Sequence, residues 1–220
     1  MSRSWVPART RTLSSEQDSD RRRQGLNVAD RYRSFTALDA EQRRGIDYCI
    51  RLRNRRTAIV VIAPHGGRIE PGSSEIAMAI ARNDYSFYTF EGLRPRRNRE
   101  LHITSTCFDE PGGVALISAA DTVIAIHGCV DGDNPWTIWA GGRADGLRNA
   151  IASSLVASGF HTKNANGPLA GQEQENICNR GTSGAGVQLE VPRTMRNKLR
   201  CDQPALQQFS DAVRQALSNR

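Results

Sequence analysis

Lysine is almost absent from this chain of 220 residues, in which arginine outnumbers it 28 to 2. Such a skew is typical of a genome-wide coding bias rather than of a binding code.

Aromatic residues make up only 6% of the chain. The mean hydropathy of −0.52 is low for a compact globule. We therefore expect part of the chain to lie outside any packed core.

Cysteine pairs with metal-site spacing are also missing. The chain has five cysteines, an odd number, and no CxxC motif. This excludes a zinc ribbon and argues against a disulfide framework. We expect reduced, mostly buried thiols at positions 49, 107, 129, 178 and 201.

Long apolar runs are lacking, which excludes a transmembrane span and a membrane partner. RRRQG at 21–25 resembles a twin-arginine signal, but no apolar segment follows it. We therefore expect a cytoplasmic protein, and we expect it to be a monomer.

The excess positive charge lies at the front of the chain. Residues 1–60 hold 14 Arg and 7 acidic residues, a net charge of +7, whereas residues 61–220 hold 16 basic and 16 acidic residues. We predict a basic, disordered arm over residues 1–30 and one domain over residues 31–220. An alternative function is polyanion or nucleic-acid binding through this arm. We do not favour it, because charge by itself argues only for solubility and steering.

Apolar patterning predicts an α/β domain. Apolar residues at helical spacing indicate a helix within 31–53, and continuous or alternating apolar runs indicate strands between later helices. This alternation favours a mainly parallel or mixed sheet with helices on both faces. The predicted strands are 57–63, 86–92, 101–106, 122–128, 136–142 and 186–192, and the main helices start near 73, 113, 144 and 204.

Chemically capable residues gather at the predicted strand ends. His65 follows the run TAIVVIAP, His127 follows TVIAI, and Glu190 lies within GVQLE. Glu70 lies in the loop after the first of these strands. Ligands of open α/β sheets bind outside the carboxyl ends of the strands, so we expect these residues to lie close together.

Two imidazoles and one carboxylate suit one catalytic Zn²⁺ per chain with an open position for water. The same set would also accept Mn²⁺ or Co²⁺. Glu190 is the candidate for moving the water proton to the leaving amine. Each residue also has a structural interpretation: a histidine near a strand end is often only hydrogen-bonded, and Glu70 could simply complement a helix dipole. The glycines after both histidines favour the metal site, because glycine permits close approach to the backbone.

These residues resemble a known family. The segments RYRSF, APHGGRIEPGSSEIA, SFYTFEG, NRELHITST, IAIHG and GVQLEVP occur here in the order found in the poly-γ-glutamate hydrolases, zinc amidohydrolases of phages and bacteria. The resemblance covers roughly residues 31–200. It implies a zinc-carboxypeptidase-like fold, metal ligands His65, Glu70 and His127, and Glu190 as general base. It also implies that a phage-derived enzyme would act outside the cell after lysis.

The resemblance implies an anionic γ-glutamyl polymer as substrate, with a free carboxylate on every unit. Arginine binds carboxylates bidentately, so cationic side chains should lie near the site. A small N-acyl amino acid such as N-formylglutamate is the alternative substrate, with the same zinc chemistry. The candidate substrate-binding residues are Arg143, Arg97, Asn98, His102 and Arg193.

Overall fold

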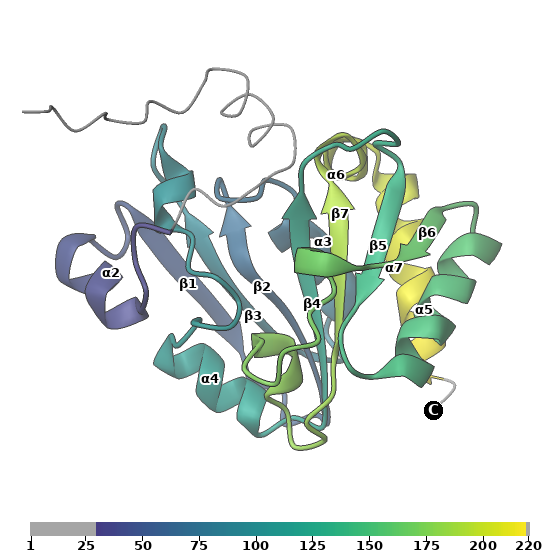
Figure 1. The fold of residues 1–220 in the computed structure, drawn as a ribbon, viewed down its shortest axis with the longest axis horizontal. Helices are drawn as coiled ribbons and strands as arrows, with labels where there is room; N and C mark the ends of the chain where they lie inside the picture. Colours follow the sequence, from purple (N-terminus) through teal and green to yellow (C-terminus); the bar gives the residue numbers. More distant parts are fainter. Residues whose placement is uncertain (1–29, 219–220) are drawn as a thin grey trace, which may run out of the picture.

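A mixed sheet of seven strands, with order β1-β3-β2-β4-β7-β5-β6, forms the centre of the molecule (Figure 1). The computed structural model describes residues 30–218. Its strands are β1 (Tyr48–Arg53), β2 (Ile59–Gly67), β3 (Ser86–Gly92), β4 (Thr122–Cys129), β5 (Thr137–Gly141), β6 (His161–Asn164) and β7 (Val187–Pro192).

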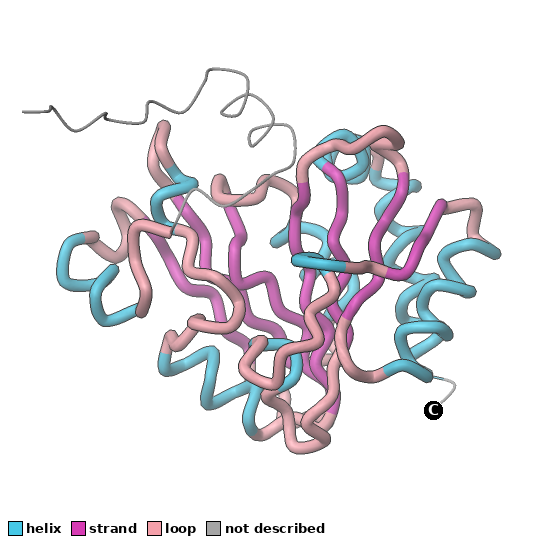
Figure 2. The backbone as a smooth tube through the Cα atoms, viewed as in Figure 1, coloured by secondary structure: helices cyan, strands magenta, loops and turns pink. Residues whose placement is uncertain are grey.

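Within residues 30–218, six α-helices and three short 3₁₀ helices connect and cover these strands, as Figure 2 illustrates. The α-helices are α2 (Phe35–Glu41), α3 (Ser73–Ala81), α4 (Pro111–Ser118), α5 (Asp145–Ala157), α6 (Arg193–Cys201) and α7 (Gln203–Ser218). The 3₁₀ helices are η1 (Asn98–Leu101), η2 (Gly167–Leu169) and η3 (Ile177–Asn179). None of the helices in residues 30–218 is long and apolar enough to cross a membrane.

The predicted mixed, mainly parallel sheet is confirmed. Strands β3, β2, β4 and β7 run parallel to one another, while β1 and β5 are antiparallel to their neighbours β3 and β7. The carboxyl ends of the four parallel strands therefore lie at the same edge of the sheet. The predicted site residues of β2, β4 and β7 are brought to this edge.

Two apolar clusters, one on each face of the sheet, form the core. The larger cluster packs β2, β4, β5 and β7 against α3, α5, α6 and α7. The smaller packs β1 to β4 against α2, α4 and η3. The central strands β2, β4 and β7 are buried on both faces, which explains their nearly continuous apolar runs.

Two of the predicted elements were wrong. The helical pattern of 31–53 is a helix only over α2, and Tyr48–Arg53 forms the edge strand β1. Pairing with β3 explains this outcome. The hydrogen bonds of six paired residues stabilise the strand more than the local helical preference of the sequence stabilises a helix. Residues 101–106 form no strand; they run from the end of η1 into a loop beside the site.

The cysteines are free, as predicted, but only Cys178 among the five is buried. The expectation of mostly buried thiols was therefore wrong. The predicted arm, residues 1–30, lies outside the described residues except for Asp30, and its boundary and its disorder stay predictions.

Candidate functional site

The end of β2 turns back on itself and places two of the predicted ligands side by side. The backbone carbonyl of His65 accepts hydrogen bonds from the backbone N–H of Glu70 at 3.0 Å and from Ser73 Oγ at 3.3 Å. The N-cap residue of α3 is Gly72, in the left-handed region at φ 104°, and no side chain caps this helix. Ser73 and Ser74 hold the His65–Glu70 loop instead.

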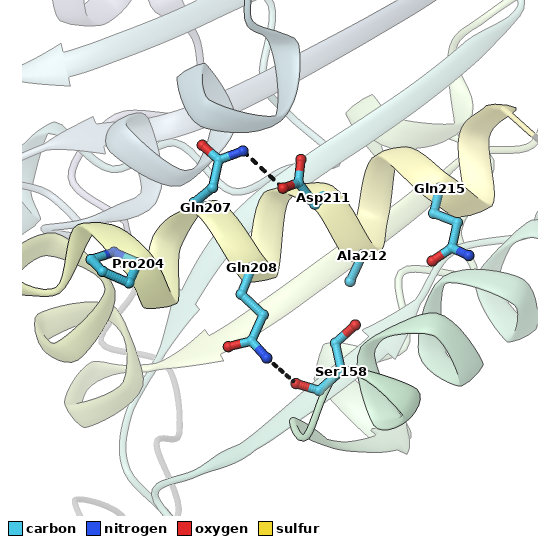
Figure 3. Close-up of a pocket in the computed structure, with 7 residues that line it drawn as sticks. All are labelled: Ser158, Pro204, Gln207, Gln208, Asp211, Ala212 and Gln215. Atoms are coloured by element: carbon cyan, nitrogen blue, oxygen red, sulfur yellow. Dashed lines mark hydrogen bonds between the residues drawn. The ribbon is translucent and has the colours of Figure 1, made fainter.

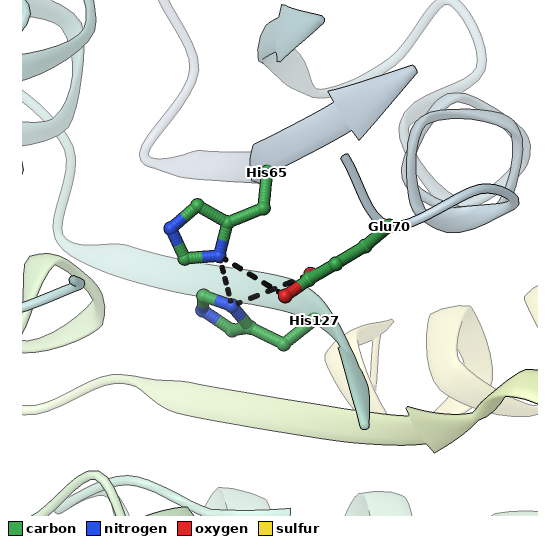
Figure 4. A group of neighbouring side chains, drawn as sticks. All are labelled: His65, Glu70 and His127. Carbon is green, nitrogen blue, oxygen red and sulfur yellow. Dashed lines mark hydrogen bonds and ion pairs between the residues drawn. The ribbon is translucent and has the colours of Figure 1, made fainter. Parts of the chain in front are cut away.

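His65, Glu70 and His127 form one buried group (Figure 4). Nδ1 of His65 lies 3.1 Å from Nδ1 of His127 and 3.4 Å from Oε1 of Glu70. Nδ1 of His127 lies 4.0 Å from Oε2 of Glu70. One donor atom from each residue lies within 4.8 Å of the others. Strand β2, its following loop and strand β4 thus bring two nitrogens and a carboxylate to one point.

Hydrogen bonds from the surrounding backbone fix the orientation of His65 and Glu70 within the group. Nε2 of His65 lies 2.7 Å from the carbonyl oxygen of Ile103, which can only accept, so Nε2 carries the proton. With the proton on Nε2, the lone pair of Nδ1 faces His127 and Glu70. The backbone N–H of Gly128 donates to Oε2 of Glu70 at 2.7 Å and fixes that carboxylate. Such outer hydrogen bonds orient metal ligands, and the donor set fits Zn²⁺.

The pKa values of the group also suit a metal site. Burial and the nearby His65 lower the pKa of His127 to about 3, so its imidazole is neutral near pH 7. Burial raises the pKa of Glu70, but the nearby imidazoles of His65 and His127 outweigh this and bring that pKa to about 2. A neutral imidazole and an ionised carboxylate are the forms that bind a cation.

Glu190 lies beside this group on β7. It is directly opposite His127 in the parallel register of β4 and β7, so both side chains project from the same face of the sheet. Burial, with a further contribution from Glu70, raises the pKa of Glu190 to about 8. Gln188 donates from Nε2 to Oε1 of Glu190 at 3.3 Å and restrains the carboxyl group.

Arg196 was not predicted from the sequence. Its buried guanidinium donates to the backbone carbonyls of Val191 at 3.0 Å, Pro71 at 2.6 Å and Cys129 at 3.4 Å. These carbonyls lie just beyond Glu190, Glu70 and His127 in the chain. One side chain of α6 therefore joins the three segments that carry the site. Nothing in the basic run around Arg196 distinguishes it from surface arginines.

His102, a predicted substrate-binding residue, lies against a predicted ligand. Its ring stacks on that of His65 with centroids 3.9 Å apart. Asp30 pairs with Nδ1 of His102 at 2.7 Å and accepts from the backbone N–H of Thr104 at 2.6 Å. Asp30 was assigned to the arm by sequence reasoning, which missed this contact because it spans 72 residues.

The predicted arginines lie on the surface. Arg97 is 71% exposed in its side chain and forms an ion pair with Glu100 at 2.5 Å. Arg143 and Arg193 are exposed, in the turn before α5 and at the start of α6. Asn98 is buried and donates to the carbonyl of Arg94 at 2.7 Å, while its Oδ1 has no partner among the described residues. Substrate contacts for these four residues stay predictions.

The glycines beside the histidines make room for protein atoms. A Cβ at Gly66 would lie 2.2 Å from the hydroxyl oxygens of Ser74 and Thr89, and one at Gly128 would lie 2.4 Å from Cζ of Arg196. We expected these glycines to open the backbone to a metal, but the space beside them is filled by protein side chains. They allow the loop after β2 and the end of β4 to pack closely.

A hollow elsewhere on the surface lacks this chemistry. It lies between α7 and Ser158 at the end of α5 (Figure 3). Gln208 donates to the carbonyl of Ser158 at 3.1 Å, and Gln207 donates to Asp211 on the same helix at 2.8 Å. It contains no histidine or cysteine, so the group at the strand ends is the better candidate site.

Comparisons with known proteins give a family for this chain. The profile of the poly-gamma-glutamate hydrolase family matches residues 32–212. The UPF0714 protein YmaC of Bacillus subtilis (strain 168) is 39% identical over 173 residues, which cover 77% of this chain and 72% of YmaC. The SPbeta prophage-derived UPF0714 protein YoqZ of the same organism is 36% identical over 78% of this chain and 62% of its own length.

Two solved structures have the same fold. A bacteriophage poly-gamma-glutamate hydrolase superposes with a TM-score of 0.81 at 30% identity, covering 87% of this chain and 98% of that one. A structure of YndL, described as apo and zinc-free, matches with the same TM-score, identity and coverage. The predicted fold class, a zinc-carboxypeptidase-like α/β domain, is thereby confirmed. With a family match over most of its length, the chain belongs to the poly-gamma-glutamate hydrolase family.

Proposed function

We propose that this chain is a zinc-dependent hydrolase that cleaves the γ-glutamyl amide bonds of poly-γ-glutamate. The observation that carries the proposal is the buried group of His65, Glu70 and His127 with Glu190 in register beside it. Family membership supports the substrate, and the description of YndL as zinc-free supports zinc as the metal.

His65, Glu70 and His127 would hold the metal through two Nδ1 atoms and a carboxylate oxygen. When bound, Zn²⁺ supplies a Lewis acid that polarises a carbonyl and makes water more acidic. The contacts of Ile103 with His65 and of Gly128 with Glu70 keep these ligands in place. Their burial keeps bulk water from competing for the site.

Glu190 would act as general base and then as general acid. It takes the proton of the attacking water and passes it to the departing amide nitrogen. In the metal-free site burial raises the pKa of Glu190. A carboxyl group whose pKa lies near the working pH both accepts and donates protons readily. Gln188 donates a hydrogen bond to this carboxyl group and so limits its rotation.

The test compares metal content with turnover in single variants. We expect Glu190→Gln to keep one zinc per chain and to lose about 10²- to 10⁴-fold in kcat. We expect His127→Ala to lose the zinc itself. Glu75→Gln is the matched control, because Glu75 lies exposed on α3 and pairs with Arg200 at 3.0 Å. Metal analysis of the purified protein and shortening of the polymer on a gel are the two measurements.

Two outcomes would contradict the proposal. A His127→Ala variant with stoichiometric zinc and full activity would remove His127 from the ligand set. Hydrolysis of a small N-acyl glutamate by a wild-type protein that leaves the polymer intact would favour the alternative substrate.

A further inference from the structure

On the face of the sheet that carries the site, strands β1 to β4 are covered by apolar side chains, and strands β7, β5 and β6 are not. On this face the smaller apolar cluster covers β1, β3, β2 and β4, and none of its residues comes from β7, β5 or β6. The same face of β7 carries Gln188 and Glu190. The residues of β5 and β6 on this face, Trp139 and Lys163, are partly buried and exposed, respectively. The apolar core therefore ends at the site, and amphipathic side chains continue beyond it.

Strand register places these side chains in one row. Glu190 pairs with His127 of β4 on one side and with Trp139 of β5 on the other, and Trp139 pairs with Lys163 of β6. Directly paired residues project from the same face. The alternate residues Ile138, Ala140 and Leu189 lie in the larger cluster on the opposite face, which confirms the assignment. The row runs across four neighbouring strands, from a proposed metal ligand to the edge of the sheet.

Lys163 places an ammonium group at the end of this row. Its Nζ lies 6.0 Å from the centroid of the Trp139 ring. No carboxylate within residues 30–218 forms an ion pair with it. Strands are about 4.8 Å apart, so β6 lies roughly 10 Å from β7. The flexible stem of a lysine lets its three donors follow a carboxylate, and the indole face packs against methylene groups.

These properties match one kind of ligand, a chain that alternates methylene pairs with carboxylates. An extended γ-glutamyl unit, with five backbone bonds, spans roughly 6 Å by standard bond lengths. The carboxylate of the second unit from the cut bond therefore falls within reach of Lys163. We propose that Trp139 and Lys163 form a substrate subsite, in which Trp139 packs on the methylenes of this second unit and Lys163 binds its carboxylate. The inference rests on the proposed function.

Binding without turnover gives the first test. Fluorescently labelled poly-γ-glutamate is titrated into zinc-loaded Glu190→Gln, with and without Lys163→Ala. We expect Lys163→Ala to weaken binding about 5- to 10-fold at low salt, Lys163→Glu to weaken it further, and Lys163→Arg to restore most of it. Lys198→Ala is the matched control, since Lys198 is the other lysine of the chain and lies 5.9 Å from the Trp136 ring. This control should bind as the parent does.

Substrate length gives the second test, in the active enzyme. We expect Lys163→Ala to raise KM for the polymer about 5- to 10-fold with little change in kcat. Kinetics on a substrate of two γ-glutamyl units should be unchanged, because that substrate lacks the second unit from the cut bond.

The possible failures can be told apart. Unchanged polymer binding and KM in Lys163→Ala, while the wild type cleaves the polymer, would overturn the subsite alone. An equal effect of Lys163→Ala on the two-unit substrate would also overturn it. A wild-type protein that neither binds nor cleaves the polymer would overturn both the subsite and the proposed function.

Discussion

At the residue scale, the candidate site shifts the pKa values of two neighbouring carboxyl groups, those of Glu70 and Glu190, in opposite directions. Neighbouring imidazoles bring the pKa of Glu70 to about 2, while burial and the charge of Glu70 raise that of Glu190 to about 8. Carboxyl groups whose environments separate their pKa values in this way take different roles in catalysis. Glu70 suits a permanent ligand, and Glu190 suits a group that exchanges a proton.

This difference predicts how the stability of the metal-free protein depends on pH. Between pH 6.5 and 8 the folded state keeps a proton on Glu190 that the unfolded chain has already released. The free energy of unfolding therefore falls as pH rises, by at most about 1.4 kcal/mol per pH unit. Glu190→Gln should lack this component. Urea unfolding of both proteins in EDTA measures the difference, and parallel curves from pH 6.5 to 8 would contradict the assignment.

At the element scale, α6 stabilises the site from behind. Within residues 30–218, Arg196 is the only side chain that hydrogen-bonds to the segments after β2, β4 and β7 together. Its guanidinium also lies against Gly128, whose N–H holds Glu70. Three carbonyls in different directions need the fork of an arginine, and the single ammonium of a lysine cannot serve them all.

We therefore predict that Arg196→Met lowers the free energy of unfolding by about 2–4 kcal/mol, because three carbonyls lose their donor. Arg196→Lys should recover only part of this. Both variants should also bind zinc about 10- to 100-fold more weakly than the wild type, because the ligand segments lose their common support. The measurements are urea unfolding and competition with a chelator.

The control for this prediction is Arg200→Ala on the same helix. Arg200 forms an exposed ion pair with Glu75, and such pairs contribute no more than about 1 kcal/mol. If Arg196→Met and Arg200→Ala had equal effects, the proposed role of Arg196 in joining the segments would be wrong.

At the scale of the whole molecule, the excess positive charge and the candidate metal ligands lie in different parts of the sequence. The net charge of +7 lies in residues 1–60, and the candidate ligands come from residues 61–220, whose net charge is zero. Any attraction to an anionic polymer at the site must come from single cations such as Lys163. The basic segment could act only through steering or through a separate polyanion contact.

Deletion of residues 1–29, which hold 6 Arg and 3 acidic residues, removes +3 of this net charge of +7 and tests the contribution of the arm. We predict that the truncated protein keeps kcat on poly-γ-glutamate, and that any affinity for DNA, measured by gel shift, is lost. The deletion must spare Asp30, which pairs with His102 beside His65. Loss of hydrolysis in the shorter protein, with its fold intact, would instead assign the arm to the catalytic domain.

The local pattern of the sequence was enough to predict the central strands and the positions of the four main site residues. Continuous β-branched runs are typical of strands buried on both faces, and residues after such strands meet at one edge of a parallel sheet. The pattern failed at β1. The apolar spacing of these residues predicts a helix, but they form a strand because they pair with β3. It also failed at Arg196 and Asp30, since nothing local marks a contact made across many residues.

The sequence alone thus determined the fold class and the kinds of side chain available for chemistry, because periodicity and residue type are local properties. Only the tertiary structure decided the distances among His65, Glu70 and His127, the shifted pKa values, and the row from Glu190 to Lys163. Each of these depends on burial and on the register between strands distant in the chain. Such properties arise only when those strands pack side by side.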